Sequence, residues 1–244
     1  VTDALTSFDA TDNSLTCIEV NEENVGWATE NWTYANGNID EGVEFSVVCV
    51  PEGYTYIHDN NFEQALIDLG YDDTLDDFVL TENIAGLDNL DVSNKEINDL
   101  TGIEDFTALS YLACSTNQLT SLDVSANTAL TSLNCNNNQL TSLDVSNNTS
   151  LASLACNSNQ LTVLDVSTNA ALTMLVCNEN QLTTLDVSNN TSLVDLQCLN
   201  NQLTTLDVSA NTALTSLNCE NNELTSLDVS TNAALTMLVC NENQ

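Results

Sequence analysis

The amino-acid sequence predicts a β-rich solenoid, in which short coils of chain stack along one axis. Residues 109–244 repeat one pattern every 21 residues. The same apolar positions return in each coil, and they are too few to form a core within one coil. A fixed period of this size is typical of proteins whose stacked units share one continuous core. Seven cysteines mark the period: Cys114, Cys135, Cys156, Cys177, Cys198, Cys219 and Cys240.

The spacing inside one coil predicts which side chains point inward. Leu133 and Cys135 alternate along one extended segment, and Leu143 and Val145 alternate along the next. Because alternate residues of a strand face the same side, we expect these four side chains to point into the core. Each coil should add one parallel strand about 4.8 Å from its neighbour. The leucines that fill the turns are Leu130, Leu140 and Leu151.

An asparagine follows each periodic cysteine by three residues, where the strand turns into a loop. A buried loop must pair its backbone N–H and C=O groups, and a stacked side-chain amide both donates and accepts hydrogen bonds. We therefore expect a structural ladder rather than a binding site. Its members are Asn117, Asn138, Asn159, Asn180, Asn201, Asn222 and Asn243.

These motifs resemble those of a known family. The pattern Leu-x-x-Leu-x-Cys-x-x-Asn-x-Leu resembles the core motif of leucine-rich repeat proteins. The nested Leu143-Asp144-Val145 resembles the short bacterial IRREKO subclass, and the periodic cysteine resembles the cysteine-ladder internalins, which are bacterial surface adhesins. The resemblance implies a right-handed superhelix with parallel strands on its concave side and short strands or turns on its convex side. It also implies an extracellular or bacterial cell-surface location.

The period is interrupted once, which predicts three segments. Leu5–Val20 aligns with one coil of the main array, so residues 1–50 are expected to be the last coil and C-terminal cap of a preceding array. Residues 51–86 are expected to be a linker and a helical N-terminal cap, and residues 87–244 the main array. A solenoid needs caps over its apolar ends. We expect a longer parent chain in which such units recur.

The N-terminal cap of the main array is predicted to contain a short helix from residue 59 to residue 70. Asn60 is expected to cap its start, with the Glu63 side chain reaching back to it, and Gly70 is expected to end the helix. Phe62, Leu66 and Leu69 share one helical face, which should cover the first coil.

Cys17 and Cys49 are the two cysteines that lie off the 21-residue spacing. We expect a disulfide between them that holds the first cap in place, which implies an oxidising compartment. The alternative is two buried free thiols. The periodic cysteines, in contrast, are expected to be free buried thiols, because metal sites need thiolates that converge on one point and parallel strands hold the Cβ atoms too far apart for bridges.

The charge of the chain excludes some partners. The formal net charge is −35 and Lys95 is the one Lys or Arg. Such a surface repels nucleic acid and anionic membranes, whereas cations, basic proteins and neutral glycans remain as partners. The longest apolar run, around residues 45–50, is too short for a membrane span.

Two groups of aspartates, one in the array and one in its N-terminal cap, are candidate sites for Ca²⁺. The outward aspartates of the array are expected to be satisfied by neighbouring Ser and Thr, with cations such as Ca²⁺ between them as the alternative; they are Asp123, Asp144, Asp165, Asp186, Asp207 and Asp228. The run Asp72, Asp73, Asp76 and Asp77 is a weak Ca²⁺ candidate, because it lacks the register of an EF-hand loop. We expect no other cofactor, no catalytic residues and no enzyme activity.

The outward positions of the first strand vary from coil to coil, while the inward positions barely change. Met174, Val176 and Leu199 place apolar side chains where a monomer gains little from them, which indicates a protein interface. Neutral variation of a free surface is the alternative. The candidate binding residues are Tyr111, Asn134, Met174, Val176, Gln197, Leu199, Asn218 and Met237.

The sequence therefore predicts an extracellular or cell-surface module that binds a protein or glycan on another surface. One alternative is a structural spacer of a long tandem-repeat surface fibre, in which neighbouring copies contact one another. A second is a non-catalytic appendage of a secreted enzyme.

Overall fold

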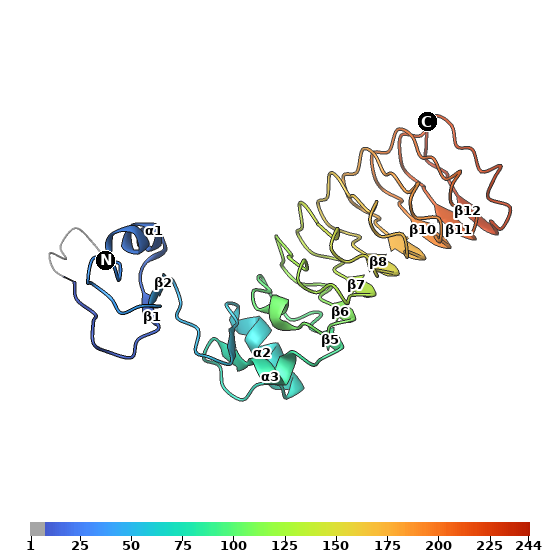
Figure 1. Ribbon diagram of the computed structural model, residues 1–244. Coiled ribbons are helices and arrows are strands. Elements are labelled where there is room, and N and C mark those ends of the chain that lie inside the picture. Colours follow the sequence, from blue (N-terminus) through green and yellow to red (C-terminus); the bar gives the residue numbers. More distant parts are fainter. Residues whose placement is uncertain (1–7) are drawn as a thin grey trace. The chain divides into compact units, whose positions relative to one another are not determined.

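The computed structural model describes residues 8–244, which form two compact units divided between Glu52 and Gly53. Figure 1 shows both units, coloured along the chain. Part of the predicted preceding coil, including Leu5, lies outside the described residues.

The first unit contains β1 (Cys17–Glu19), α1 (Glu22–Asn31) and β2 (Glu44–Ser46). The two strands are parallel, as are the strands of neighbouring coils in the main array. A disulfide joins Cys17 to Cys49, so the segment after β2 is tied back to the start of β1. The small core of the unit is aromatic, and the ring of Phe8 stacks on Trp32 with 4.2 Å between centroids.

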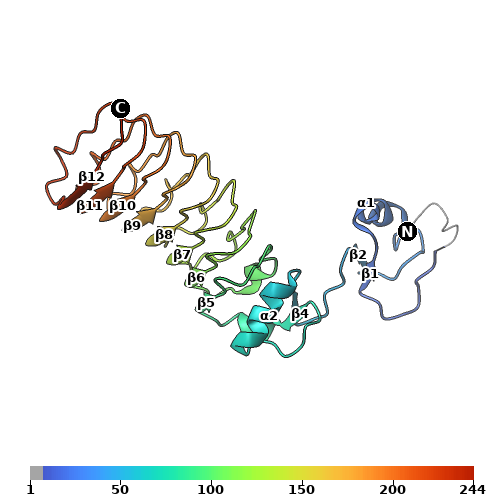
Figure 2. The same ribbon diagram turned by 180° about the vertical axis from the view of Figure 1, so that it is seen from behind.

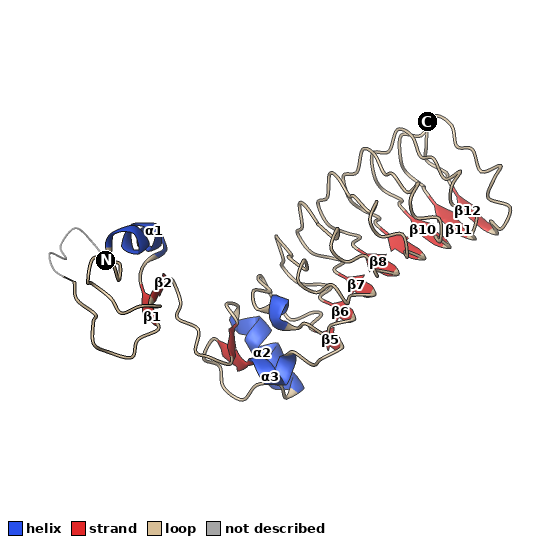
Figure 3. Ribbon diagram, in the orientation of Figure 1, coloured by secondary structure: helices blue, strands red, loops and turns tan. Residues whose placement is uncertain are grey.

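The second unit opens with a cap of two short strands and two helices. These are β3 (Tyr54–Tyr56), α2 (Asn60–Leu69), β4 (Phe78–Leu80) and α3 (Thr81–Ile84), and β3 pairs with β4 in the antiparallel sense. Phe62 of α2 lies against Phe106 of the first coil, with 6.1 Å between ring centroids. The cap therefore covers the start of the array, and Figure 3 shows its helices gathered at that end.

Two details of α2 differ from the sequence prediction. The residue that caps the helix is Asp59, not Asn60: its Oδ1 accepts from the backbone N–H groups of Asn61 (2.8 Å) and Phe62 (3.1 Å). A carboxylate caps well because it is a stronger acceptor than an amide and complements the helix dipole. Leu69 is 45% exposed and does not join the buried face, which Ala65 completes instead. Gly70 ends the helix in the left-handed region, with φ of 82°.

The array itself is an eight-stranded parallel sheet that runs in chain order from β5 to β12. Consecutive strands pair in register, so Leu133 lies opposite Leu154, which lies opposite Leu175. This arrangement confirms the predicted solenoid. A 3-10 helix, η1 (Ile103–Asp105), occupies the irregular second half of the first coil. The strands are β5 (Asn89–Asp91), β6 (Tyr111–Ala113), β7 (Ser132–Asn134), β8 (Ser153–Ala155), β9 (Met174–Val176), β10 (Asp195–Gln197), β11 (Ser216–Asn218) and β12 (Met237–Val239).

The core runs without interruption through the array. In the coil that begins at Leu130, the side chains of Leu133, Cys135 and Val145 have 1% or less of their surface exposed. Their counterparts in the following coils are buried in the same way, up to Leu224. Buried apolar area of this kind stabilises a fold by roughly 25 cal/mol per Å². The second half of each coil consists of turns rather than a regular strand, with one isolated bridge between Asp123 and Asp144.

The asparagine ladder pairs the backbone between coils. Asn138 donates from Nδ2 to the carbonyl oxygens of Cys114 (3.0 Å) and Cys135 (3.1 Å), and its Oδ1 accepts from the N–H of Leu119 (3.0 Å). The same three bonds recur in the following coils. The residue before each ladder asparagine is in the left-handed region, with φ between 50° and 55°.

The structure contains a second asparagine ladder that was not predicted from the sequence. Asn148 lies in the turn after Val145, is fully buried, and donates to the carbonyl oxygens of Val124 (3.0 Å) and Asn127 (2.9 Å). This ladder supports the far side of each coil, as the first supports the strand end. Its members are Asn127, Asn148, Asn169, Asn190, Asn211 and Asn232.

Candidate binding face

The strands β5–β12 lie along one side of the array and the turns along the other, as Figure 1 and the reverse view in Figure 2 show. We call the outward side of these strands the strand face. Each coil contributes to it the first and third residues of its strand and the residue two positions further on. The sequence-predicted binding residues all occupy such positions.

Met174, Val176 and Leu199 form what we call the apolar patch. Strand register places Met174 between Ser153 and Asp195, and Val176 between Ala155 and Gln197. Leu199 follows β10 two residues after Gln197, one coil along and diagonal to Val176. All three side chains are half-buried, so they rest partly on their neighbours and present the remainder to solvent.

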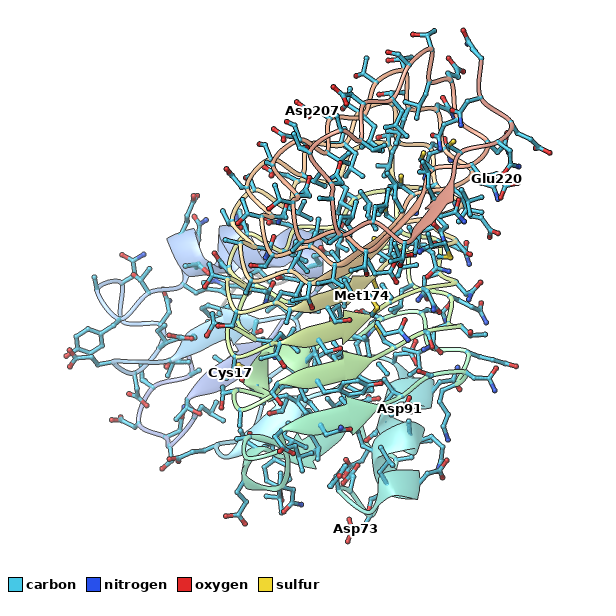
Figure 4. The ribbon with its side chains drawn as sticks, turned by 90° about the vertical axis from the view of Figure 1, so that its right-hand side faces the viewer. Cys17, Asp73, Asp91, Met174, Asp207 and Glu220 are labelled. Carbon is cyan, nitrogen blue, oxygen red and sulfur yellow. A yellow bond between two sulfur atoms is a disulfide. The ribbon has the colours of Figure 1, made fainter. Side chains whose placement is uncertain are left out.

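The patch has a polar border that is already hydrogen-bonded. Gln197 donates from Nε2 to the carboxylate of Asp195 (2.6 Å) and to the hydroxyl of Ser216 (3.1 Å). These bonds hold the Gln197 amide against the sheet. An apolar surface rimmed by fixed polar groups is typical of a protein-binding site. Figure 4 shows Met174 over the middle of the sheet and Glu220 beyond the end of the strands.

The other predicted binding residues are spread along the strand face. Tyr111 lies on β6, three strands from Met174, and Met237 lies on β12, also three strands away. Asn134 and Asn218 use Oδ1 to accept from the N–H two residues on, at 3.3 Å and 3.1 Å. Tyr111, Asn134 and Asn218 are half-buried and Met237 is exposed, so each has surface available. Asn218 lies opposite Gln197, beside the apolar patch, whereas intervening strands separate the other three from it.

Directly beneath the strand face lies the row of periodic cysteines. All seven are free thiols, six are buried and Cys240 is exposed. Burial raises the pKa of the Cys135 thiol to about 12 and that of Cys219 to about 11. Such thiols stay protonated at neutral pH and behave as small apolar groups rather than as metal ligands or nucleophiles. The predicted cysteine ladder is confirmed.

Known proteins share this construction. A family model described as the LVIVD repeat matches residues 175–196. Internalin J of Listeria monocytogenes is 46% identical over 52 residues, which make up 21% of this chain and 6% of that protein. The solved functional domain of InlJ from Listeria monocytogenes, which includes a cysteine ladder, is 42% identical with a TM-score of 0.74, over 81% of this chain and 44% of that one. The chain is an internalin-like leucine-rich repeat protein.

A leucine-rich repeat protein of Leptospira interrogans extends the comparison, at 26% identity and a TM-score of 0.63 over 67% of this chain and 45% of that chain. The internalin-like chain thus spans less than half of the length of either solved structure. None of these relatives indicates a catalytic family. Among residues 8–244, no helix is both long and apolar enough to cross a membrane.

The aspartate row of the internalin-like array lies on the turns, away from the strands; Figure 4 shows Asp207 there. Each aspartate accepts from the N–H of the serine two residues on, for example Asp144 from Ser146 at 2.9 Å. Hydrogen bonds from the backbone and side chain of Ser146 lower the pKa of Asp144. The neighbouring serines thus supply the hydrogen bonds that the sequence predicted for this row.

The acidic run of the cap forms a loop between α2 and β4, and Figure 4 places Asp73 beyond the helices of the cap. Asp72 and Asp73 line a cavity of about 340 Å³, together with Asp76. Asp77 lies in the left-handed region, with φ of 69°, and its carbonyl oxygen accepts from the N–H of Ile57. Among residues 8–244, no group of three or more His, Cys, Asp or Glu side chains is arranged to hold a metal ion. The four aspartates therefore do not form a complete site by themselves.

Proposed function

We propose that this chain is a cell-surface or extracellular binding module that recognises a protein partner through the strand face, with the apolar patch at the centre of the contact. The observation that carries the proposal is the placement of Met174, Val176 and Leu199. Three apolar side chains occupy outward positions in two adjacent coils, where they add little to the core.

Their energetic role would be that of an anchor. Half-buried apolar side chains at the centre of a contact lose their remaining solvent exposure when a partner covers them, and a few such residues commonly dominate binding. The net charge of −35 adds long-range attraction for a basic partner surface. The likeness to the InlJ domain supports adhesion as the biological setting.

The test is to measure adhesion of the labelled chain to candidate cell surfaces and to compare two variants. In the first, Met174, Val176 and Leu199 are replaced by Ser. The second carries Val163→Ser, which alters a 65% exposed residue on the turns. We expect the first to lose at least about tenfold in affinity, since each truncated anchor costs about 1 kcal/mol or more, and the second to bind normally. Protease treatment of the cells should abolish binding, and glycosidase treatment should not.

A spacer role remains the second candidate, because residues 168–181 recur letter for letter at residues 231–244. Recent duplication of this kind suits a segment selected for length. Equal adhesion of the two variants, or none by the unaltered chain, would favour the spacer.

A further inference from the structure

The cap contains a fully buried carboxylate in which one of the two oxygens has no hydrogen-bond partner. Glu63 lies on α2 and has none of its surface exposed. Its Oε1 accepts from the N–H of Asp76 at 2.8 Å, which fixes the carboxylate against the acidic loop. Its Oε2 is buried and has no hydrogen-bond partner. Burying an ionised carboxylate is costly unless each oxygen is compensated.

A second carboxylate, Asp72 in the acidic loop after α2, also has one oxygen without a hydrogen-bond partner. Asp72 uses Oδ1 to accept from the N–H of Asp73 at 2.9 Å, while its Oδ2 is buried without a partner. The two groups affect one another: burial raises the pKa of Glu63, and the negative charge of Asp72 raises it further. The cap thus buries two carboxylate oxygens, one on α2 and one on the loop that follows it, without a hydrogen-bond partner for either.

No cationic side chain of this chain compensates them. Lys95 is the one Lys or Arg in the sequence, and its Nζ lies 2.9 Å from Asp68 Oδ2. The one histidine, His58, has Nδ1 2.9 Å from the hydroxyl of Tyr56. The positive charge that balances Glu63 and Asp72 must therefore come from solvent, as a proton or as a metal ion.

We propose that Glu63 and Asp72 bind a Ca²⁺ ion, and that backbone carbonyl oxygens and water complete its shell. Ca²⁺ accepts six to eight oxygen ligands in flexible geometry and readily uses carbonyls and water, so two carboxylates suffice for the charged part of the shell. Mg²⁺ fits less well because it demands near-octahedral geometry and gives up its water reluctantly.

The surroundings favour a divalent ion over a single proton. Asp73, Asp76 and Asp77 belong to the same loop, so the local potential is strongly negative. Asp72, Asp73 and Asp76 line a cavity of about 340 Å³, so there is space for an ion next to the Asp72 end of the proposed site. Bound there, the ion would hold α2 to the loop before β4 and would stabilise the cap over the first coil.

The experiment is calorimetric titration of the whole chain with CaCl₂, paired with thermal unfolding in Ca²⁺, in Mg²⁺, and in EDTA with NaCl at matched ionic strength. The variants are Glu63→Gln and Asp72→Asn, with Asp207→Asn in the array as the matched control. We expect one Ca²⁺ per chain and a rise of several degrees in the melting temperature of the unaltered chain and of the control.

Both cap variants should lose at least about tenfold in Ca²⁺ affinity. In EDTA, their melting temperatures should be no lower than that of the unaltered chain, because a neutral amide removes the buried negative charge. Tb³⁺ offers a local readout, since Tyr54 and Tyr71 line the cavity and can sensitise its luminescence. That signal should appear in the control and disappear in Glu63→Gln.

Two results would overturn the proposal. If Ca²⁺ raises the melting temperature of Glu63→Gln as much as that of the control, the ion only screens the acidic surface. If Ca²⁺ has no effect on the unaltered chain, the balancing charge is a proton.

Discussion

Asn159 reaches back from its own coil and donates from Nδ2 to the carbonyl oxygen of Cys135, 3.0 Å away in the preceding coil. The same amide also donates to Cys156 at 3.1 Å, so it joins two coils through one side chain. Each periodic cysteine carbonyl from Cys114 to Cys219 in turn accepts from two asparagines, as Cys135 does from Asn138 and Asn159. This sharing makes the ladder continuous along the array.

Asn159→Ala should lower the free energy of unfolding by about 1–3 kcal/mol, the cost of leaving one buried group without a partner. The carbonyls keep a second donor, but the N–H of Leu140 loses its one acceptor, Asn159 Oδ1. Denaturant unfolding would measure the loss. The matched control is Asn157→Ala on the strand face, which should cost far less; equal losses would contradict the ladder's structural role.

Thr116→Asn should stabilise the array by about 1 kcal/mol, because a β-branched residue in the left-handed region is strained and asparagine tolerates that region. Thr116 has φ of 54° and is exposed, and its counterparts at 137, 200 and 221 are already asparagine. Thr120→Asn, at an exposed position without positive φ, serves as the control. A destabilised Thr116→Asn would show that the threonine side chain has another role.

The thiols should react in two classes. In the folded chain we expect only Cys240 to react quickly with a thiol reagent at mildly alkaline pH, because the other six ladder thiols are buried and burial raises their pKa. The unfolded, unreduced chain should expose seven thiols, the nine cysteines less the two in the disulfide. Nine reactive thiols would disprove the disulfide. One reactive thiol would mean that six of the seven periodic cysteines had formed disulfides with one another.

Stability in EDTA should peak at mildly acidic pH. The pKa of Asp144 is lowered by its serine partner, so its contribution is lost as the pH falls through the folded-state pKa. The pKa of Glu63 is raised, chiefly by burial, so the folded chain binds that proton more tightly and stability falls as the pH rises through the folded-state pKa. Melting temperatures from about pH 3 to about pH 8 would show both limbs. Glu63→Gln should flatten the alkaline limb, and an unchanged limb would mean that Glu63 does not cause it.

The repeat period made the inward and outward positions of the array predictable, because the inward positions carry the same apolar residue types in every coil while the outward positions vary. Leu133 and Cys135 could be assigned from alternation alone. The second ladder was missed because Asn148 stands in a Ser-Asn-Asn-Thr run that reads as an ordinary polar turn; only the coil-to-coil stacking buries it. Its regular recurrence at 21 residues was the available signal.

The cap was less predictable because it occurs once. Asp59 and Asn60 are both good capping residues, and the choice between them depends on Asn98 and Asp99, whose N–H groups also donate to Asp59 Oδ2. Glu63 was expected to reach back to the helix start, yet it turns toward Asp76. Such contacts join residues far apart in the sequence, and no local pattern encodes them.

Site-directed photo-cross-linking tests the proposed strand-face binding most directly. A photoreactive residue would replace Ser153, beside Met174 on the strand face, or Val163, on the turns of the same coil. Each labelled chain would be bound to the adherent cell surface and irradiated. We predict a cross-linked protein adduct from position 153 and none from position 163. An adduct from position 163 alone, or equal adducts from both, would contradict recognition through the strand face.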